Sequence, residues 1–304
     1  MQSIAAIEKW NERFAVPGIA ELVAGQGGLP KIHVTAAEAS ADVYLHGAQL
    51  TSWQPAGCEE VIFLSEHSRW EEGRAIRGGI PVCFPWFRAK ADNPQAPAHG
   101  VVRTTAWQLE SLTHQQGCVT AALAIESSEA SHHWWPFEFR LVHRITMGAE
   151  LKLELIVTNT GSTALRFEEA LHTYHRVGSV ESIRIAGLDG TAFLDNTDGN
   201  REKTQQGAVV IMRPTDNAYL NTQNALQLID PVMRRRIHIE KKNSLTTVVW
   251  NPWKEGAKSL ADLGNEEWQR MACVEASNIL DSAVVLPPGK EHRMEATTTV
   301  TIDT

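Results

Sequence analysis

Two titratable side chains, His172 and Glu275, lie in stretches whose apolar residues alternate as in β-strands. A histidine on the polar face of an open sheet is available for proton transfer near neutral pH. Glu275 points away from the face formed by Val274 and Ala276, and burial beside apolar groups raises a carboxylate pKa toward the range of a general base. These residue types favour acid–base chemistry, although a structural histidine and a solvent-exposed glutamate explain each residue taken alone.

Residues 77–87, RGGIPVCFPWF, combine an arginine with two glycines, two prolines and three aromatic rings. Glycines allow a ligand to approach the backbone closely, and prolines make a loop rigid. Aromatic faces suit the C–H face of a sugar ring, whereas the guanidinium fork of Arg77 suits phosphate or hydroxyl oxygens. A buried corner between two sheets with a surface arginine explains the same composition, and the residues alone leave both interpretations open.

His99 and Arg103 form a second pair of candidates. In a strand, a spacing of four residues places both side chains on one face. His99 could then donate a hydrogen bond to a sugar hydroxyl while Arg103 binds an anion. A histidine beside a glycine, here Gly100, is also common as an ordinary turn residue.

Other kinds of catalytic site are not indicated. The chain has no GxSxG, HExxH, P-loop or GxGxxG motif, so a serine hydrolase, a zinc peptidase and a nucleotide-binding protein are not expected. None of the twelve histidines has metal-ligand spacing backed by carboxylates or cysteines, and His172 and His175 diverge in a strand. The four cysteines form no CxxC pair and are interpreted as reduced thiols. We expect neither a metal nor an organic cofactor.

The period of the apolar residues changes once along the chain. A short N-terminal helix is predicted where apolar residues recur at helical spacing over residues 4–14, with Ser3 as its N-cap. Beyond it, alternating runs such as residues 137–161 are separated by turn residues, which is typical of antiparallel strands. About fifteen or more strands and little helix predict an all-β fold, a large antiparallel two-sheet β-sandwich. Without a repeat period or a linker, residues 1–304 are predicted to form one domain.

The formal net charge of −8 argues against a broad basic surface for nucleic acid or an anionic membrane. Charged residues interrupt the apolar core that a signal peptide would need at the N-terminus. No run of about 18 apolar residues is present to span a membrane. An anionic substrate would need a local arginine cluster instead. We expect a monomeric cytoplasmic protein.

The order of several motifs resembles that of the glucose-6-phosphate 1-epimerase family of the galactose-mutarotase-like superfamily. The motifs are GAQLTSWQPAG, IRGGIPVCFPWF, AHGVVR, LHTYHRV, GLDGTAFLD, TDNAYL, VVWNPW and CVEASN followed by LPPG. They extend from about residue 31 to the C-terminus and so cover nearly the whole chain. The resemblance implies a large two-sheet sandwich, which agrees with the strand pattern.

The resemblance also implies roles for individual residues. The histidine of LHTY and the glutamate of CVE are the catalytic pair of that family, and they match His172 and Glu275. The aspartate of TD-x-x-Y holds sugar hydroxyls, and the arginines of RGG and HG-x-x-R contact phosphate and sugar. The implied substrate-binding residues are Arg77, His99, Arg103 and Asp216.

The activity that the resemblance implies is interconversion of the α and β anomers of a hexose 6-phosphate, with glucose 6-phosphate as the expected substrate. The chain departs from the family pattern at Arg88, where a glycine commonly follows PWF, and a phosphate contact by Arg88 is left open. A non-catalytic carbohydrate-binding or sensor protein is the alternative from another class, because fold alone does not decide function. A β-sandwich glycosidase or lyase is a further alternative, and a glycosidase would use Asp216 and Glu275 as paired carboxylates.

Overall fold

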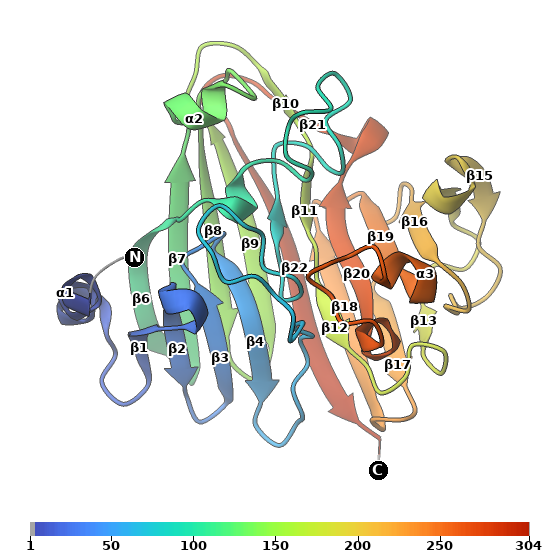
Figure 1. The fold of residues 1–304 in the computed structure, drawn as a ribbon, viewed down its shortest axis with the longest axis horizontal. Coiled ribbons are helices and arrows are strands. Elements are labelled where there is room, and N and C mark those ends of the chain that lie inside the picture. Colours follow the sequence, from blue (N-terminus) through green and yellow to red (C-terminus); the bar gives the residue numbers. More distant parts are fainter. Residues whose placement is uncertain (1–3, 304) are drawn as a thin grey trace.

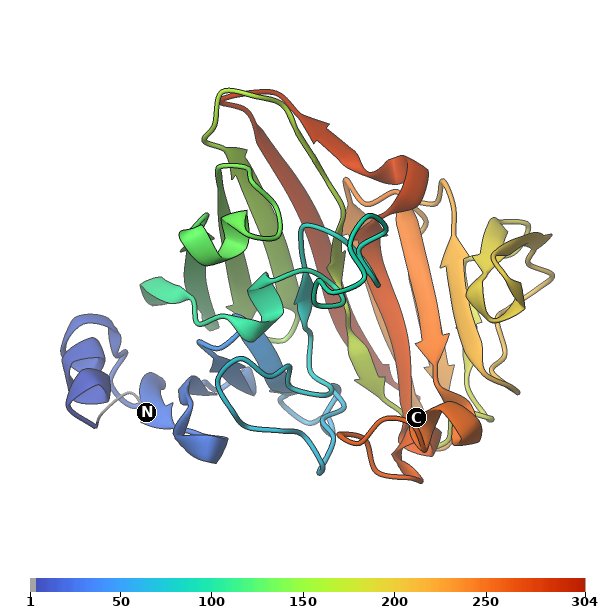
Figure 2. The ribbon, with the colours of Figure 1, turned by 45° about the horizontal axis from the view of Figure 1, so that its top comes forward.

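The computed structural model describes residues 4–303, and its main feature is two layers of antiparallel strands (Figures 1 and 2). One layer is a single eight-stranded sheet. In spatial order its strands are β13 (Arg184–Ala186), β17 (Leu226–Asp230), β18 (Arg235–Lys242), β22 (Glu291–Ile302), β9 (Leu151–Asn159), β8 (Phe139–Met147), β7 (Cys118–Glu126) and β6 (Gln108–Gln115). The C-terminal strand therefore lies in the middle of this sheet.

The other layer is built from two sheets. The first is β1 (Ala20–Ala24), β2 (Pro30–Thr35), β3 (Ala39–Tyr44) and β4 (Gln49–Pro55). The second is β15 (Arg201–Thr204), β14 (Ala192–Asp195), β16 (Thr215–Tyr219), β19 (Thr246–Asn251), β20 (Met271–Asn278), β11 (Glu169–Leu171) and β5 (Val82–Cys83), with β12 (Tyr174–Arg176) also paired to β20. An isolated bridge between Leu50 and Ile80 joins β4 to the segment that enters β5, so the two sheets form one layer.

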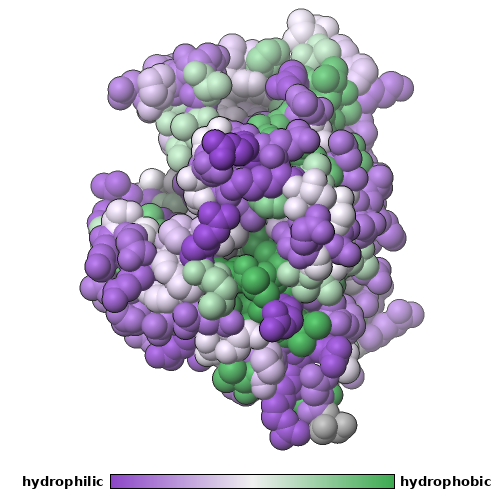
Figure 3. All heavy atoms as spheres, turned by 90° about the vertical axis from the view of Figure 1, so that its right-hand side faces the viewer, coloured by the Kyte–Doolittle hydropathy of each residue, from purple (hydrophilic) through white to green (hydrophobic). Residues whose placement is uncertain are grey.

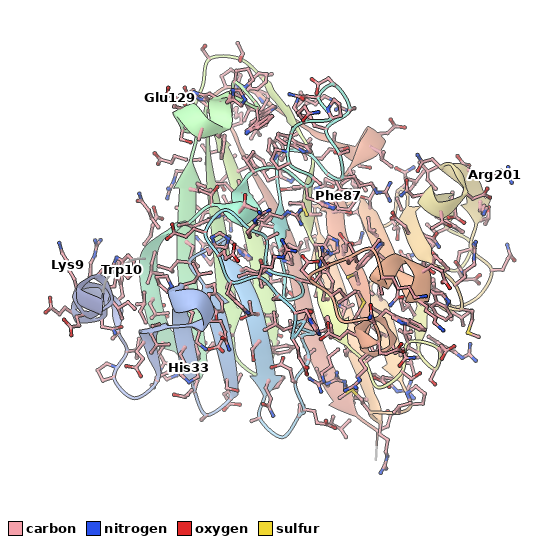
Figure 4. All side chains as sticks on the ribbon, in the orientation of Figure 1. Lys9, Trp10, His33, Phe87, Glu129 and Arg201 are labelled. Carbon is pink, nitrogen blue, oxygen red and sulfur yellow. The ribbon has the colours of Figure 1, made fainter. Side chains whose placement is uncertain are left out.

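Smaller elements lie at the edges of this sandwich. They are the two-stranded sheet of β10 (Leu165–Phe167) and β21 (Val284–Leu286), and the helices α1 (Ile4–Phe14), α2 (Glu129–His132) and α3 (Trp253–Ala257). The predicted N-terminal helix is confirmed as α1, whose Trp10, labelled in Figure 4, packs against the core. Ser3, its expected N-cap, lies outside the described residues. None of the helices in residues 4–303 is long and apolar enough to cross a membrane.

Alternation of apolar and polar residues explains the central strands. β8 and β9 form the hairpin that the sequence predicts, and Leu151, Leu153 and Leu155 of β9 point into the core, each at most 2% exposed. The layers are also tied together by polar groups. His143 Nδ1 of β8 lies 3.0 Å from the carbonyl oxygen of Ala48. An all-β fold with a short N-terminal helix and a two-layer sandwich is therefore confirmed.

The side chain of Lys241, on β18, is buried, and its ammonium donates a hydrogen bond to the carbonyl oxygen of Thr246 (2.8 Å). Burial lowers the pKa of Lys241 to about 7, whereas an unfolded lysine keeps a pKa of about 10.4. Between these values the unfolded chain binds the additional proton. The free energy of unfolding is therefore expected to rise from about pH 7 toward about pH 10. Below about pH 7 the folded protein carries the full destabilisation from burying the charged lysine.

Lys241→Met is expected to remove this rise and to stabilise the protein most at or below about pH 7, as measured by urea unfolding at several pH values. Lys242→Met is the matched control, because the neighbouring Lys242 side chain is 74% exposed. A pH dependence of unfolding that is the same in wild type and Lys241→Met would contradict the expectation.

Candidate active site

His172 and Glu275, separated by about a hundred residues in the sequence, meet at one cavity of about 250 Å³. Glu275 lies in the middle of β20, which has β19 on one side and β11 on the other, and its side chain is fully buried. His172 Nε2 is 3.4 Å from Glu275 Oε1, and neither carboxylate oxygen has a hydrogen-bond partner. Two acid–base groups therefore face a common space with hydrogen-bonding capacity left for a ligand.

The backbone that carries His172 is not the continuous strand expected from the sequence. β11 ends at Leu171 and β12 begins at Tyr174, so His172 lies in the break between them. Its ring stacks on that of Tyr174, with centroids 4.9 Å apart, and meets the edge of Trp250 at 5.9 Å. These two aromatic contacts hold the imidazole in one orientation beside Glu275.

Burial sets the protonation of the pair. It lowers the pKa of His172 to about 3, and the positive charges of Arg103 and Arg77 add to this effect. Burial also raises the pKa of Glu275 well above its ordinary value, and the nearby Asp216 carboxylate adds to this rise. Both shifts favour the neutral forms, an imidazole and a carboxylic acid. One proton transfer from Glu275 to His172 gives imidazolium and carboxylate without a change in net charge.

The structure brings all six candidate residues to the same cavity. Its lining residues are Arg77, Phe87, Arg88, Ala98, His99, Arg103, His172, Asp216, Val248, Trp250, Leu260 and Glu275. Phe87, labelled in Figure 4, contacts the ring of His99 edge to face with centroids 4.8 Å apart. The cavity thus combines aromatic and aliphatic surface with charged groups, which is the composition of a site for a polar small molecule.

The predicted strand carrying His99 and Arg103 is wrong, although both residues reach the cavity. His99 and Gly100 have left-handed backbones (φ 64° and 78°), and a short 3₁₀ helix, Val102–Thr104, follows. A Cβ atom at Gly100 would lie 1.8 Å from the carbonyl oxygen of Phe84, so only glycine fits where these two segments cross. A tight turn, and not strand alternation, therefore aims both side chains at the site.

Arg77 is held firmly at the edge of the cavity. Its Nε and Nη2 atoms donate to the two carboxylate oxygens of Asp262 (3.1 and 3.2 Å), and Nη1 donates to the Tyr174 hydroxyl (3.1 Å). Arg103 is bound more loosely. Its Nη2 donates to the carbonyl oxygen of Ala98 (2.9 Å), and its buried Nε has no partner.

Both arginines also line an adjoining cavity of about 300 Å³. Arg69 and Arg74 line the same space, so four arginines surround a cavity that shares Arg77 and Arg103 with the one lined by His172 and Glu275. Neither Arg69 nor Arg74 is among the residues singled out from the sequence. Three arginines within the nine residues of RWEEGRAIR were the available signal, since a phosphate site requires such a local cluster in an acidic chain.

Asp216 of β16 is already paired. It accepts hydrogen bonds from Arg88 Nη2 and from Asn196 Nδ2, the latter at 2.6 Å. Arg88, whose backbone is left-handed (φ 59°), also lies over the ring of Phe87. Arg88 therefore contributes a positive charge to the sugar side of the cavity, next to the carboxylate expected to hold hydroxyls.

The model of the aldose 1-epimerase family matches residues 30–299. The chain belongs to the aldose 1-epimerase family. Two relatives named "Putative glucose-6-phosphate 1-epimerase" are similar to it. The relative from Cenchrus ciliaris is 33% identical, with 90% of this chain and 85% of the relative covered. The other, from Escherichia coli (strain K12), is 33% identical, with 84% of this chain and 85% of the relative covered.

A solved structure supports the same placement. The crystal structure of a "putative mutarotase" from Salmonella typhimurium superposes with a TM-score of 0.89 and 28% sequence identity, over 98% of this chain and 99% of that one. The resemblance drawn from the order of the motifs is confirmed. As an aldose 1-epimerase, the chain is an isomerase that acts at the anomeric carbon of a sugar.

Arg88→Gly tests one of the positions at which the motif resemblance leads us to expect another residue, and glycine suits the left-handed backbone there. The positive charge of Arg88 opposes the rise in the pKa of Glu275, so the variant is expected to move the carboxylate limb of the pH–rate profile upward. Loss of a charged hydrogen-bond donor is expected to raise KM by roughly tenfold. Steady-state kinetics across pH would measure both, and an unchanged profile would show that Arg88 does not act on the site.

Arg213→Gly is the control for Arg88→Gly, because Arg213 also pairs with an aspartate, Asp195, but does not line the catalytic cavity. Its profile and KM are expected to match those of the wild type.

Proposed function

We propose that this protein interconverts the α and β anomers of a hexose 6-phosphate, with glucose 6-phosphate as its substrate. The proposal depends on one observation, the approach of His172 Nε2 to Glu275 Oε1 in a cavity that continues into an arginine-lined space. The names of the two relatives described above support a phosphorylated substrate.

The proposed reaction needs only proton transfers and the breaking and re-forming of one C–O bond. Glu275, as carboxylate, takes the proton of the C1 hydroxyl while the C1–O5 bond breaks, and O5 takes a proton from the His172 imidazolium. The open-chain aldehyde then rotates about C1–C2. On reclosure O5 returns its proton to His172 and attacks C1, and O1 recovers a proton from Glu275, which gives the other anomer.

The charged form of the pair has to be reached before the first step. Burial of both groups favours the form in which the proton is on Glu275. Transfer of this proton to His172 across 3.4 Å changes no net charge. A bound sugar favours the charged form when its hydroxyls hydrogen-bond to the carboxylate, which has no partner in the protein.

Four arginines provide the charge for the phosphate group. We place the phosphate between Arg77 and Arg103, toward Arg69 and Arg74, since Arg77 and Arg103 line both cavities and Arg69 and Arg74 line the adjoining one. Asp262 holds the guanidinium of Arg77 in place, but its carboxylate also counters part of the positive charge of Arg77. Arg103 has a buried Nε without a partner and no carboxylate partner among the described residues, so its charge is available to a ligand.

Asp216 and His99 are proposed to bind the sugar hydroxyls. Burial, together with the charge of Arg103, lowers the pKa of His99 well below its usual value. Its Nδ1 accepts a hydrogen bond from the backbone N–H of Arg88 (3.2 Å), so the neutral ring can donate through Nε2–H to a sugar hydroxyl. Asp216 accepts from Arg88 and can accept from a sugar hydroxyl through its remaining lone pairs. Neither role needs a metal or an organic cofactor.

We also propose that residues 1–304 act as one domain and as a cytoplasmic monomer without a nucleic-acid or membrane partner. One hydrophobic cluster that runs from Phe14 to Ala296 supports a single domain. The net charge of −8 supports the absence of nucleic-acid binding. On the face at the right of Figure 1, hydrophilic atoms predominate and hydrophobic ones gather in small patches, in keeping with a surface exposed to water (Figure 3).

The deciding experiment starts from freshly dissolved α-glucose 6-phosphate and follows the β anomer with an anomer-specific coupled assay. The wild-type protein is expected to shorten the approach to equilibrium markedly relative to the spontaneous reaction. No acceleration would contradict the proposed activity. The same assay with glucose and galactose tests the substrate class, and equal acceleration of free glucose would contradict a phosphate site.

A further inference from the structure

A cysteine that the proposed reaction does not use lies beside the catalytic pair. Cys273 and Glu275 are two residues apart on β20, so their side chains point to the same side of the sheet. His172 reaches this side from the break between β11 and β12. The imidazole nitrogen, the thiol sulfur and a carboxylate oxygen all lie within 4.8 Å of one another, and all three side chains are buried.

These groups lack the partners that buried polar atoms normally have. Both carboxylate oxygens of Glu275 and Nδ1 of His172 make no hydrogen bond, and Cys273 is a free thiol. Buried polar groups without partners are uncommon in folded proteins. Unused hydrogen-bonding capacity on His172 and Glu275 beside a free thiol therefore makes these three side chains a potential ligand set for a metal ion that competes with the sugar for the same atoms.

We propose that His172, Cys273 and Glu275 form a Zn²⁺ site at which the metal inhibits the epimerase. Zinc binds this combination of ligands, with bonds of about 2.0–2.3 Å that place ligand atoms about 3.3–3.6 Å apart in a tetrahedron. The spacing of His172 Nε2 and Glu275 Oε1, 3.4 Å, already fits, and the thiol has to approach by about 1 Å. The fourth position opens to the cavity that His172 and Glu275 line.

The charges around the cluster are compatible with a divalent ion. On binding, the thiol and the carboxyl group release their protons to solvent, and the resulting two negative charges balance Zn²⁺. The guanidinium of Arg77 is countered by Asp262, and that of Arg88 by Asp216. Arg103 has no carboxylate partner and opposes the metal, so we expect weaker binding than at a closed structural zinc site.

Inhibition follows because the metal and the reaction need the same atoms. A Zn²⁺ ion on His172 and Glu275 removes the acceptor for the C1 hydroxyl proton and the donor for O5. The ion also occupies the end of the cavity where C1 has to lie, so metal and hexose phosphate compete. Metal binding itself does not depend on the proposed activity, whereas the inhibition rests on it.

The test measures binding and activity separately. Metal-free protein is dialysed against micromolar Zn²⁺ and analysed for bound metal, and Co²⁺ is used as a probe whose thiolate ligand gives a charge-transfer absorption in the near ultraviolet. One equivalent of Zn²⁺, a Co²⁺–thiolate band and inhibition that a chelator reverses are expected. Mg²⁺, which prefers oxygen ligands, is expected to give neither binding nor inhibition.

Cys273→Ala is expected to lower Zn²⁺ affinity by at least about tenfold and to abolish the Co²⁺ band, with turnover in metal-free buffer retained. Cys83→Ala is the matched control, because Cys83 is also a buried free thiol but does not belong to the cluster. If Cys273→Ala does not fold, Glu275→Gln is analysed for metal binding alone and is expected to lose it.

No bound Zn²⁺ in the wild type, or equal binding by wild type and Cys273→Ala, would overturn the zinc site. Binding without inhibition in an active enzyme would overturn its inhibitory role. An inactive protein that still binds zinc through Cys273 would count against the proposed epimerase function and leave the metal site standing.

Discussion

Glu275→Gln and His172→Asn are each expected to lower kcat by about 10²–10⁴-fold with KM nearly unchanged. Each variant keeps the shape of the side chain close to that of the original but removes the group that accepts or delivers a proton at the hemiacetal. Both side chains are buried at the cavity, so water cannot readily replace them. Initial rates of β-anomer formation from α-glucose 6-phosphate at several concentrations measure kcat and KM for each variant.

Two variants elsewhere in the same sheet are the controls. Glu169→Gln changes another fully buried glutamate, on β11, which contacts Asn278 and His292 and does not line the cavity. His175→Asn changes a buried histidine three residues after His172 that also does not line the cavity. Both are expected to retain kcat within a few-fold. Near-wild-type turnover in Glu275→Gln or His172→Asn would reject the assigned pair.

Much of the fold was predictable because it depends on a local pattern. The alternation of Leu151, Leu153 and Leu155 has the same meaning in any antiparallel sheet, and the β8–β9 hairpin follows from it. The position of Glu275 within its sheet was harder to predict from the sequence. Sequence alone left open an exposed edge strand, but β20 is flanked by β19 and β11, and this placement depends on pairing between distant segments.

Some site residues were predicted correctly from the sequence although the local backbone structure predicted for them was wrong. His99 and Arg103 were placed on a strand face, whereas a left-handed turn at Gly100 presents them to the cavity. A single sequence does not reveal that Phe84 crosses at this point and requires glycine. The resemblance of the motif order identified the residues because it does not depend on knowing the local backbone.

Pairing partners are the part of the site that sequence reasoning missed. Nothing in the local sequence connects Arg77 with Asp262, which lies 185 residues further along the chain, or Arg88 with Asp216. These pairs decide how much of each charge is available to a ligand. Arg77 and Arg88 each pair with a carboxylate, whereas Arg103 donates a hydrogen bond to a backbone carbonyl oxygen, and this has a direct consequence for phosphate recognition.

Arg103→Ala is expected to reduce the preference for glucose 6-phosphate over glucose by about 10–150-fold in kcat/KM, since a hydrogen bond to a charged group contributes about 1.5–3 kcal/mol. Arg77→Ala is expected to act in the same direction. It also leaves the carboxylate of Asp262 without its partner near the phosphate, so its effect should be at least as large. Parallel anomer assays on the two sugars measure the preference.

The comparison of the two sugars separates a phosphate contact from general damage to the site. A variant that merely distorts the cavity lowers kcat/KM for glucose and glucose 6-phosphate together, whereas loss of a phosphate contact lowers only the second value. Arg140→Ala is the control, because Arg140 pairs with Glu110 on the surface and does not line either cavity. Since Arg69 and Arg74 share the adjoining cavity with Arg77 and Arg103, Arg69→Ala and Arg74→Ala should show smaller losses of the same kind. An unchanged preference in Arg103→Ala and Arg77→Ala would mean that the phosphate group binds elsewhere.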